Sequence, residues 1–307
     1  MTCTLDEALE ALLAGQPLEL NRIDARVRGQ LEALGLAVET SSPPRLRRCA
    51  DSVRLNAGAI RRAGLADGLT VQALLSCAST NDLLRQRFRH RHAVLAEAQT
   101  AGRGRYGRHW LSPPGTGLCL SFGYRFAAGM PVPGALSPSV ALALAEALSL
   151  PELRVKWPND LVARDLKLAG VLIELRSAGD GIAAIIGVGL NVDLGVCRDR
   201  VREATQRGMI DLAALGASCL DRNRIAARLL NALDRICSRW HREAGVGLAE
   251  RYARLDALAG RVLRVATGQG VLEGRAAGIC ADGRLRLIDA SGSEHRIAAG
   301  EVQLDGG

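Results

Sequence analysis

The order of apolar segments between residues 70 and 255 constrains the fold more than any other feature of this chain. Four extended apolar runs alternate with two helical patterns, the runs at 93–98, 117–126, 169–175 and 182–192 and the helices at 137–149 and 221–242. Strands and helices mixed in this order pack as layers, with the helices covering a sheet. We therefore predict an α+β unit built on a mixed β-sheet packed with helices.

Different patterns flank this unit. Residues 5–13 and 23–36 place apolar side chains at helical spacing, and 38–55 reads as short extended pieces around a Pro-Pro turn. From Leu258 onward, short β runs cut by glycine predict a small closed barrel. A chain of 307 residues has room for three domains. We expect them to span residues 1–68, 69–256 and 257–307.

The composition fits a globular, cytoplasmic protein. The chain is 48% hydrophobic, yet no apolar run is long enough to span a membrane, and its first residues are acidic where a secretion signal would be basic. Its eight cysteines form no C-x-x-C pair, which disfavours a structural zinc site and indicates reduced thiols. We predict no membrane association.

The net charge of +8 is concentrated around one loop. Residues 81–110 carry seven arginines against Asp82 and Glu97, whereas residues 1–70 carry nine arginines against nine acids. A charge gathered in one place indicates a compact anionic ligand more than a long phosphate backbone.

That loop contains GRGRYG, residues 102–107, which matches the dinucleotide fingerprint by letter only. Prolines at 113 and 114 block the helix that the fingerprint requires, and no Walker lysine is present. The remaining interpretation is a glycine-rich turn that presents guanidinium groups to phosphate oxygens, with a solvated arginine loop as the alternative. The residues concerned are Arg103, Arg105 and Arg108, followed by Trp110, whose indole can cover a ligand.

The chain has only two lysines, and both lie in the stretch KWPNDLVARDLKLAG. Lys156 ends one extended run and Lys167 begins another, with the turn residues Asn159 and Asp160 between them. If these two strands form a hairpin, both ammonium groups face one cavity. An ammonium is a compact charge that fits a narrow gap between two anions, whereas a guanidinium is wider. Such a gap arises when a carboxylate attacks a phosphate.

Two further segments offer ligand-facing groups. GVGLNV places Gly187 and Gly189 in a strand, where close approach of another group is expected, and Asn191 follows. CASTND supplies a cluster of hydroxyl and amide groups in Ser79, Thr80 and Asn81. Each segment alone also fits a bulged core strand or a helix cap.

Together these motifs resemble those of the biotin–protein ligases. STN, GRGRYGR, KWPND, KLAGVLIE and GVGLNV occur in the family's order across roughly residues 75–195, and the helix DRNRIAARLL and the C-terminal segment extend the similarity. The resemblance implies a catalytic domain like those of class II aminoacyl-tRNA synthetases. It also implies a C-terminal SH3-like barrel and an N-terminal winged-helix-like module.

The resemblance implies a two-step reaction that uses biotin, ATP and Mg²⁺. Biotin and the α-phosphate of ATP form biotinyl-5′-AMP, and a lysine of a biotin carboxyl carrier protein then takes the biotinyl group. The implied catalytic residues are Lys167, Arg103, Lys156 and Asp160. The implied biotin-binding residues are Ser79, Thr80, Asn81, Gln99, Gly102, Arg103, Lys167 and Gly170. The implied ATP- and adenylate-binding residues are Arg103, Arg105, Arg108, Trp110, Lys156, Asn159 and Asn191.

Individual roles follow from the same resemblance. Lys167 would bridge the biotin carboxyl and the α-phosphate, and Lys156 would bind phosphate. Asp160 would receive the proton of the acceptor lysine, and Asn191 would contact adenine. No residue is assigned as a metal ligand.

Two departures from the family pattern bear on function. Tyr106 stands where many relatives carry another basic residue. The segment AGQPLELNR between the first two helices is too short for a complete helix-turn-helix, and the module has no net charge. We therefore expect a degenerate winged-helix-like module without specific DNA binding. A homodimer through an exposed sheet edge stays open.

Three alternatives remain at this point. A lipoate–protein ligase shares the catalytic fold, but its arginine-then-triple-glycine signature is missing here. A biotin-responsive repressor with ligase activity is disfavoured by the neutral N-terminal segment. An arginine-rich RNA-binding protein is disfavoured because aromatic residues make up 3% of the chain.

Overall fold

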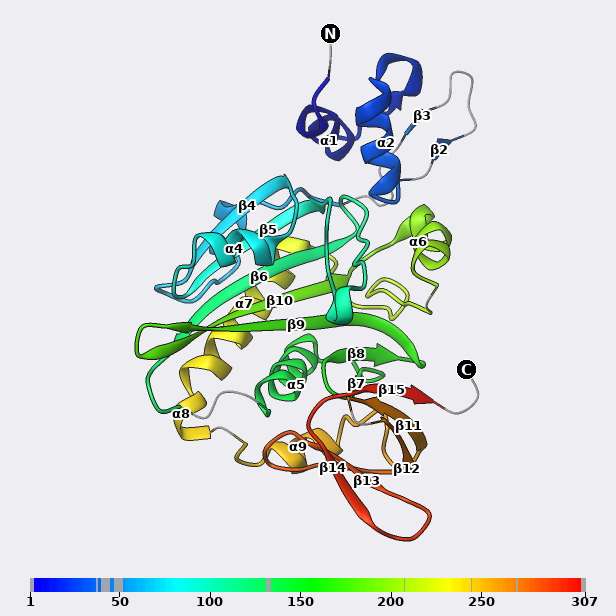
Figure 1. The fold of residues 1–307 in the computed structure, drawn as a ribbon. Coiled ribbons are helices and arrows are strands. Elements are labelled where there is room, and N and C mark those ends of the chain that lie inside the picture. The colour runs from blue at the N-terminus through cyan, green and yellow to red at the C-terminus, as the bar shows by residue number, and fades with distance from the viewer. Residues whose placement is uncertain are drawn as a thin grey trace.

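A mixed seven-stranded β-sheet organises the molecule (Figure 1). The computed structural model describes residues 3–36, 38–39, 45–46, 52–130, 134–206, 208–243, 245–268 and 270–304. Within this part of the chain the strand order is β4-β5-β6-β10-β9-β8-β7. Only the β4–β5 pair is parallel, so the predicted mixed sheet is confirmed. The strands span Thr70–Cys77 (β4), His92–Gln99 (β5), Gly117–Phe126 (β6), Arg154–Lys156 (β7), Asp160–Ala163 (β8), Leu166–Ala178 (β9) and Gly181–Asn191 (β10).

Two long helices cover one face of the sheet, as predicted. They are α5 (Leu136–Leu148) and α7 (Arg222–Ser238), and they pack against each other as well as against the strands. Asp221 caps α7 by accepting hydrogen bonds from the first backbone N–H groups of the helix. The predicted helix 221–242 is interrupted after Ser238, and the short helices α8 (Trp240–Glu243) and α9 (Leu248–Ala253) follow.

The two faces of the central strands carry different side chains. On β6 and β10, alternate residues such as Phe122 and Ile186 are buried in the main core beneath the helices. The residues between them are small, among them Ser121, Gly187 and Gly189, because successive side chains of a strand point to opposite faces. This second face carries the short helix α4 (Thr80–Gln86), and the rest of it is left for the pocket described below.

The expected hairpin between the two lysine-bearing strands is wrong. β8 lies between β7 and β9 and pairs antiparallel with both. Asp160 opens β8 instead of sharing a turn with Asn159, and its backbone pairs with Lys156 on one side and Gly170 on the other. The two lysines therefore reach the same region across an intervening strand.

The N-terminal module has a three-stranded sheet beside two helices. Its elements are α1 (Leu5–Leu13), β1 (Leu18–Glu19), the 3₁₀ helix η1 (Leu20–Arg22), α2 (Ala25–Ala33), β2 (Val38–Glu39) and β3 (Arg45–Leu46), with strand order β1-β3-β2. The single turn η1 stands between β1 and α2, where no full helix forms. The antiparallel β2–β3 pair agrees with the short extended pieces predicted in this segment. The expected Pro-Pro turn lies outside the described residues.

The module shares a hydrophobic core with the central unit. Leu9 and Leu31 of its helices pack in one cluster with Leu111, Leu194 and Val201 of the central unit. α6 (Arg198–Thr205) is also tied to α2, because the Arg200 guanidinium donates to the Glu32 carbonyl at 3.1 Å. Figure 1 shows α1 and α2 above β4 and beside α6. The module is therefore docked on the central unit.

The packing bears on the proposed division at residue 68. α3 (Ala57–Arg62) precedes that position, yet Ile60 is buried in the main core and the helix packs against α7. We propose that the central unit begins before α3 and that the C-terminal unit begins near residue 257, ahead of its first strand.

A buried ion pair anchors the connection between the module and the sheet. The Arg222 guanidinium of α7 donates to both oxygens of Glu97 on β5, at 2.6 and 3.1 Å, and both side chains are almost fully buried. Glu97 also accepts from the backbone N–H of Leu55, and Arg222 donates to the Val53 carbonyl. The chain segment that leaves the N-terminal module is therefore bound to the strand that carries Gln99.

The C-terminal unit is a five-stranded antiparallel sheet, in agreement with the strands predicted for a small SH3-like barrel. Its order is β14-β13-β12-β11-β15, and its apolar side chains, such as Leu263 and Leu287, join the main core. The Trp157 indole donates to the Gly283 carbonyl at 2.9 Å, which fixes this unit beside β7. The strands span Val262–Thr267 (β11), Gly270–Ile279 (β12), Leu285–Ile288 (β13), Glu294–Ile297 (β14) and Glu301–Leu304 (β15).

The structure describes seven of the cysteines. Cys197 is disulfide-bonded, so the expectation of reduced thiols is wrong at this residue. The other six cysteines that the structure describes are free. In the described part of the chain, every helix is too short or too polar to cross a membrane.

The buried ion pair yields a stability prediction. Glu97→Gln leaves the Arg222 charge buried without its counter-charge, so we expect the free energy of unfolding to fall by about 3–5 kcal/mol in urea denaturation. The exposed Arg251–Glu146 pair is the matched control, and Arg251→Ala should cost less than about 1 kcal/mol. Equal losses in the two variants would contradict the structural role of Glu97.

Candidate active site

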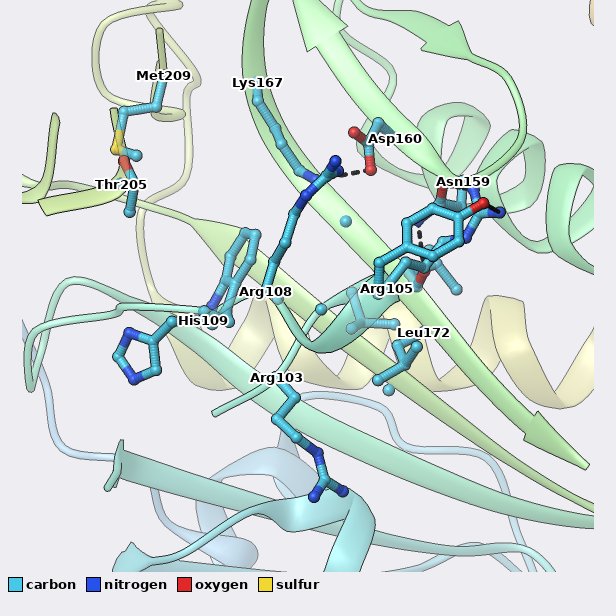
Figure 2. Close-up of a pocket in the computed structure, with 18 of the residues that line it drawn as sticks. Arg103, Arg105, Arg108, His109, Asn159, Asp160, Lys167, Leu172, Thr205 and Met209 are labelled. Carbon is cyan, nitrogen blue, oxygen red and sulfur yellow. Dashed lines mark hydrogen bonds and ion pairs between the residues drawn. The ribbon is translucent and has the colours of Figure 1, made fainter. Parts of the chain in front are cut away.

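One cleft gathers nearly all the residues singled out in the sequence. It encloses about 690 Å³ above the small-residue face of the sheet (Figure 2). Its walls are the loop that follows β5, the segment 156–160, the residues around 204–209 and the start of β15. Every predicted site residue lines this cleft except Gly102, which lies at the base of the loop.

Glycines of β9 and β10 form the floor of the cleft. Gly189 pairs with Cys119 and Gly170, and Gly187 pairs with Ser121 and Leu172. A methyl group on Gly189 would overlap the Trp110 indole, and one on Gly187 would overlap the Asn81 amide. The predicted close approach to these glycines is confirmed, and the approaching groups are two side chains of the same site.

Hydroxyl and amide groups form one end of the cleft. The Gln99 amide oxygen accepts from the backbone N–H of Thr80 at 2.8 Å and from its hydroxyl at 3.1 Å. The Ser121 hydroxyl bonds to Thr80, and the Asn81 amide donates to Glu174 at 2.7 Å. These side chains are mostly buried and hold one another in place. They form a neutral, pre-organised polar surface.

Ser79 has a second function in this region. Its hydroxyl accepts from the Asp82 N–H and so caps α4, as the alternative interpretation of CASTND expected, while the residue also lines the cleft. The cap and the pocket therefore use the same residue.

An ion pair lies near the centre of the cleft. The Lys167 ammonium donates to Asp160 at 2.7 Å, and each side chain keeps about a fifth to a quarter of its surface exposed (Figure 2). A Cβ atom on Gly170 would come within 3.0 Å of the Lys167 ammonium and 3.4 Å of the Asp160 carboxylate. The absence of a side chain at 170 therefore leaves the space that the pair occupies.

Backbone contacts fix the position of Lys167. Its N–H donates to the Gly208 carbonyl at 3.1 Å, and its own carbonyl accepts from the Ile210 N–H at 3.0 Å. Met209, between these two residues, lines the cleft and packs on the hydrophobic cluster that the N-terminal module shares with the central unit. The start of β9 is thus held by a segment that borders this shared cluster.

Asn191 and Asn159 are engaged by the protein itself. The Asn191 amide donates to the carbonyls of Ile210 and Lys167, at 3.1 and 3.4 Å. The Asn159 amide donates to the Val171 carbonyl at 2.7 Å. Both residues line the cleft, but their N–H groups hold β9 in place. The implied adenine contact of Asn191 stays a prediction, and the structure adds a positioning role.

The three loop arginines point to different places. Figure 2 shows Arg108 extending toward Lys167, whereas Arg103 is directed away from it toward α4. Arg103 forms an ion pair with Asp82 at 2.6 Å, and Arg105 donates to the Asn159 amide oxygen at 3.1 Å. Arg108 forms an ion pair with Glu301 of β15. All three line the one cleft, but Arg103 is engaged outside its centre.

Trp110 forms the wall behind the ion pair. Its ring centroid lies 5.7 Å from the Lys167 ammonium, a cation–π distance. Its indole N–H is buried and has no partner within the protein. A buried donor without a partner is unfavourable, so the indole N–H is available to a bound acceptor.

Sequence reasoning gave no role to several residues in and behind the cleft. Leu172 lines the cleft from within KLAGVLIE, and Ser121, which bonds to Thr80, lies in a predicted strand outside every motif. Glu301 comes from the far end of the chain, and only the last strand of the C-terminal unit brings it to the loop. The period-2 alternation of β6 could have identified Ser121 as a neighbour of the glycine-bearing strand. No local signal marks Glu301.

Cys119 adds a buried thiol to the floor. Burial, the largest influence, raises its pKa to about 11, although hydrogen bonds from Ser112 and Gln99 act in the opposite direction. The thiol therefore stays protonated and neutral at physiological pH, and it contributes an apolar surface to the cleft.

Comparison with known proteins places this site in a family. Residues 74–191 match the model of the Biotin/lipoate A/B protein ligase family, and residues 260–305 match the Biotin protein ligase C terminal domain. The chain is 36% identical over 249 residues to the "Bifunctional ligase/repressor BirA" of Escherichia coli, covering 78% of this chain and 76% of that protein. It is also 36% identical to the "Biotin--[acetyl-CoA-carboxylase] ligase" of Mycobacterium tuberculosis, with 68% and 77% covered.

A solved structure has a similar fold. The biotin protein ligase from Aquifex aeolicus in complex with biotin and ATP matches with a TM-score of 0.62 and 26% identity. The match covers 76% of this chain and 97% of that protein.

The state of Cys119 yields a test of the cleft. Because the neutral thiol is a weak nucleophile, we expect iodoacetamide at pH 8 to modify Cys119 at least about tenfold more slowly than the partly exposed Cys219. Peptide mass spectrometry after timed quenching measures both rates in one sample. Equal rates in the native protein would contradict the buried, protonated thiol.

Proposed function

Because this chain belongs to the biotin protein ligase family and is a biotin ligase, we propose that it biotinylates a lysine of a biotin carboxyl carrier protein through biotinyl-5′-AMP. The observation that carries the proposal is the Lys167–Asp160 ion pair, which lies over the glycine floor beside Arg108. The Lys167 ammonium supplies a positive charge inside the cleft, where we propose that the two anionic reactants meet.

In the first step, a biotin carboxylate oxygen attacks the α-phosphorus of ATP and pyrophosphate leaves. Two unit anions about 4 Å apart repel by roughly 4 kcal/mol at an effective dielectric constant near 20. Without compensation, that repulsion slows the attack about a thousandfold. We propose that the Lys167 ammonium bridges the carboxylate and the α-phosphate and so removes most of this repulsion.

The polar end of the cleft suits the ureido ring of biotin. Ser79, Thr80, Asn81 and Gln99 offer donors and acceptors without net charge, as a neutral ring requires. The apolar floor and Trp110 are then left for the rest of the ligand. We propose that the ring lies at this end and the carboxylate points toward Lys167.

Cationic side chains surround the other end. Arg105 and Arg108 reach it from the loop, and Lys156 lines it from β7. We propose that these groups bind the phosphates of ATP. For Arg103 to take part, it must exchange Asp82 for a phosphate when ligand binds, and we propose that this exchange orders the loop over the adenylate.

In the second step, the acceptor lysine amine attacks the acyl carbon, the acyl–phosphate bond breaks and AMP leaves. The attacking nitrogen must lose a proton. Asp160 lies at the reacting centre as a carboxylate, paired with Lys167. We propose that it accepts this proton.

Magnesium fits as a companion of ATP. Among the described residues, no group of three histidine, cysteine or acidic side chains forms a metal cage. Mg²⁺ commonly binds substrate phosphates with one or two carboxylates. Asp160 and Asp165 are carboxylates of the cleft that could supply such a ligand. Mg²⁺ would neutralise charge on the β- and γ-phosphates, which leave together as pyrophosphate.

Two related functions are separated by simple measurements. Pyrophosphate release with biotin but not with lipoate distinguishes this proposal from lipoate ligation. DNA repression is disfavoured by η1, a single turn where a full helix would be needed, and by the shared core that holds α2 against the central unit. We propose that the module binds no specific operator, and a gel shift with biotin and ATP present tests this.

The role of Lys167 leads to a direct prediction. Lys167→Ala should slow biotinyl-adenylate formation by about 10²–10³-fold in single-turnover assays, while circular dichroism and thermal unfolding stay near those of the native protein. Lys167→Arg should recover little, because the wider guanidinium has no room over Gly170. Adenylate formation near the native rate in Lys167→Ala would refute the assignment.

Gly170 allows the geometry to be tested with the charge kept. In Gly170→Ala the new methyl group displaces the flexible end of Lys167, so stability should change little while adenylate formation falls about 10–100-fold. Gly29→Ala, at an open helix position with no neighbour within 4 Å, is the control and should keep full activity. An unchanged rate in Gly170→Ala would show that the pair needs no such space.

A further inference from the structure

A group of exposed arginines lies on the same face of the sheet as the cleft. We call it the basic ridge, and it consists of Arg85, Arg87, Arg89, Arg125 and Arg176. Arg85 lies in the last turn of α4, and Arg87 and Arg89 follow that helix. Arg125 and Arg176 belong to β6 and β9 near the turn between β9 and β10, at the left of Figure 1.

The strand register places the ridge relative to the cleft. Ala183 pairs with both Arg125 and Arg176, so these two arginines form one row across three strands, about 10 Å apart. The row of Ser121, Gly187 and Leu172, of which the last two line the cleft, lies four residues away along the strands, about 13 Å. An even offset keeps both rows on one face of the sheet.

An aromatic ring holds the ridge in place. The guanidinium carbons of Arg176 and Arg125 lie 5.1 and 5.9 Å from the Phe88 ring centroid. Arg176 also donates to the Arg85 carbonyl at 2.6 Å. Phe88 itself packs against the small cluster of Leu84 and neighbouring residues under α4. The guanidinium groups are therefore fixed on a rigid base, with further donors free to face solvent.

The charge of the ridge is not balanced locally. Asp82 and Glu174 are the acids that contact it, and Arg85 pairs with Asp82 at 2.6 Å and with Glu174 at 3.9 Å. Asp82 is also bound by Arg103, and Glu174 accepts from Asn81. In the part of the chain that the structure describes, the remaining four arginines of the ridge form no ion pair. Such a surface attracts an anionic partner.

We infer that the basic ridge is the docking surface for an acidic face of the protein acceptor. This inference rests on the proposed function and adds to it the place and charge of the partner. The Arg125–Arg176 row lies six residues along β9 from Gly170, which underlies the Lys167–Asp160 pair, a distance of about 20 Å. A domain of about 100 residues has a radius of gyration of about 13 Å, so one seated on the ridge can also place a lysine over the cleft. Arginine and aromatic side chains together are typical of protein interfaces.

Other occupants fit this surface less well. In a two-fold dimer through the ridge the same arginines would face each other, and like charges oppose such contact. A nucleic acid would need a longer basic track than a row about 10 Å wide. The position beside the cleft gives a protein substrate a reason to bind here.

The test uses two matched double variants of the full chain. Arg125→Glu with Arg176→Glu reverses the ridge, and neither residue belongs to the proposed catalytic machinery. Arg224→Glu with Arg228→Glu reverses the same charge on the exposed side of α7, which packs on the opposite face of the sheet. The probes are biotin, ATP, hydroxylamine and a purified biotin carboxyl carrier domain, with immobilised duplex DNA as a separate probe for nucleic-acid binding.

Three readouts separate docking from chemistry. Biotin-dependent exchange of labelled pyrophosphate into ATP reports the first step without an acceptor. Biotinyl hydroxamate formed by hydroxylamine reports acyl transfer to a small amine that needs no docking surface. Biotinylation of the carrier domain at varied concentration reports acceptor KM and kcat, at low salt and again at about 0.5 M salt, where charges are strongly screened.

The expected result is specific to the ridge. At low salt the ridge variant should raise acceptor KM about tenfold or more with kcat, pyrophosphate exchange and hydroxamate formation unchanged. The difference should shrink at high salt, and the α7 variant should stay within about twofold of the native protein. Failure of the native protein to exchange pyrophosphate would refute the proposed function itself.

Other outcomes overturn the inference about the ridge. An unchanged acceptor KM in the ridge variant at low salt excludes docking there, as does an equal rise in the α7 variant. If acceptor KM is unchanged while retention on duplex DNA is lost, the ridge binds nucleic acid instead.

Discussion

The contact between the Lys167 ammonium and the Asp160 carboxylate is the interaction on which the rest of the site depends. At 2.7 Å the carboxylate holds the ammonium within the cleft, and the bare backbone of Gly170 leaves room for both groups. A lysine without such a partner would explore many rotamers, and its charge would be spread over the mouth of the cleft. The pair therefore converts a flexible side chain into a fixed charge.

Distant parts of the chain support this fixed charge. Backbone hydrogen bonds with Gly208 and Ile210 hold Lys167 at the start of β9. The Asn191 amide donates to the carbonyls of Lys167 and Ile210 and so links the same two segments. Met209 in turn packs on the hydrophobic cluster that the N-terminal module shares with the central unit. One wall of the cleft is therefore continuous with the core that holds the module.

Much of this arrangement could be predicted from sequence. Strands were placed correctly where apolar runs were long, as in β6 and β10, and the residues of GRGRYGR, KWPND and KLAGVLIE do meet in one cleft. β8 was missed because its four residues are too few for a periodic pattern to emerge. The sequence therefore predicted correctly that the segments of Lys156 and Lys167 lie together. The predicted hairpin between them was wrong, because β8 lies between the two strands.

Partners that lie far away in the chain could not be predicted. The Arg103–Asp82 and Arg108–Glu301 ion pairs join the loop to α4 and to β15, and only the folded structure brings these carboxylates within reach. The hydrogen-bond partners of Asn191 could not be predicted either, because a sequence shows that an amide is present but not which carbonyls it binds. Long-range electrostatic partners are set by topology, and local sequence does not encode them.

The most direct measurement is a crystal structure of this protein with a non-hydrolysable biotinyl-adenylate analogue. The Lys167 ammonium should lie within about 3 Å of both an acyl-derived oxygen and an α-phosphate oxygen, with Gly170 beneath it. An analogue bound in the cleft with Lys167 still contacting only Asp160 would contradict the central role of that charge.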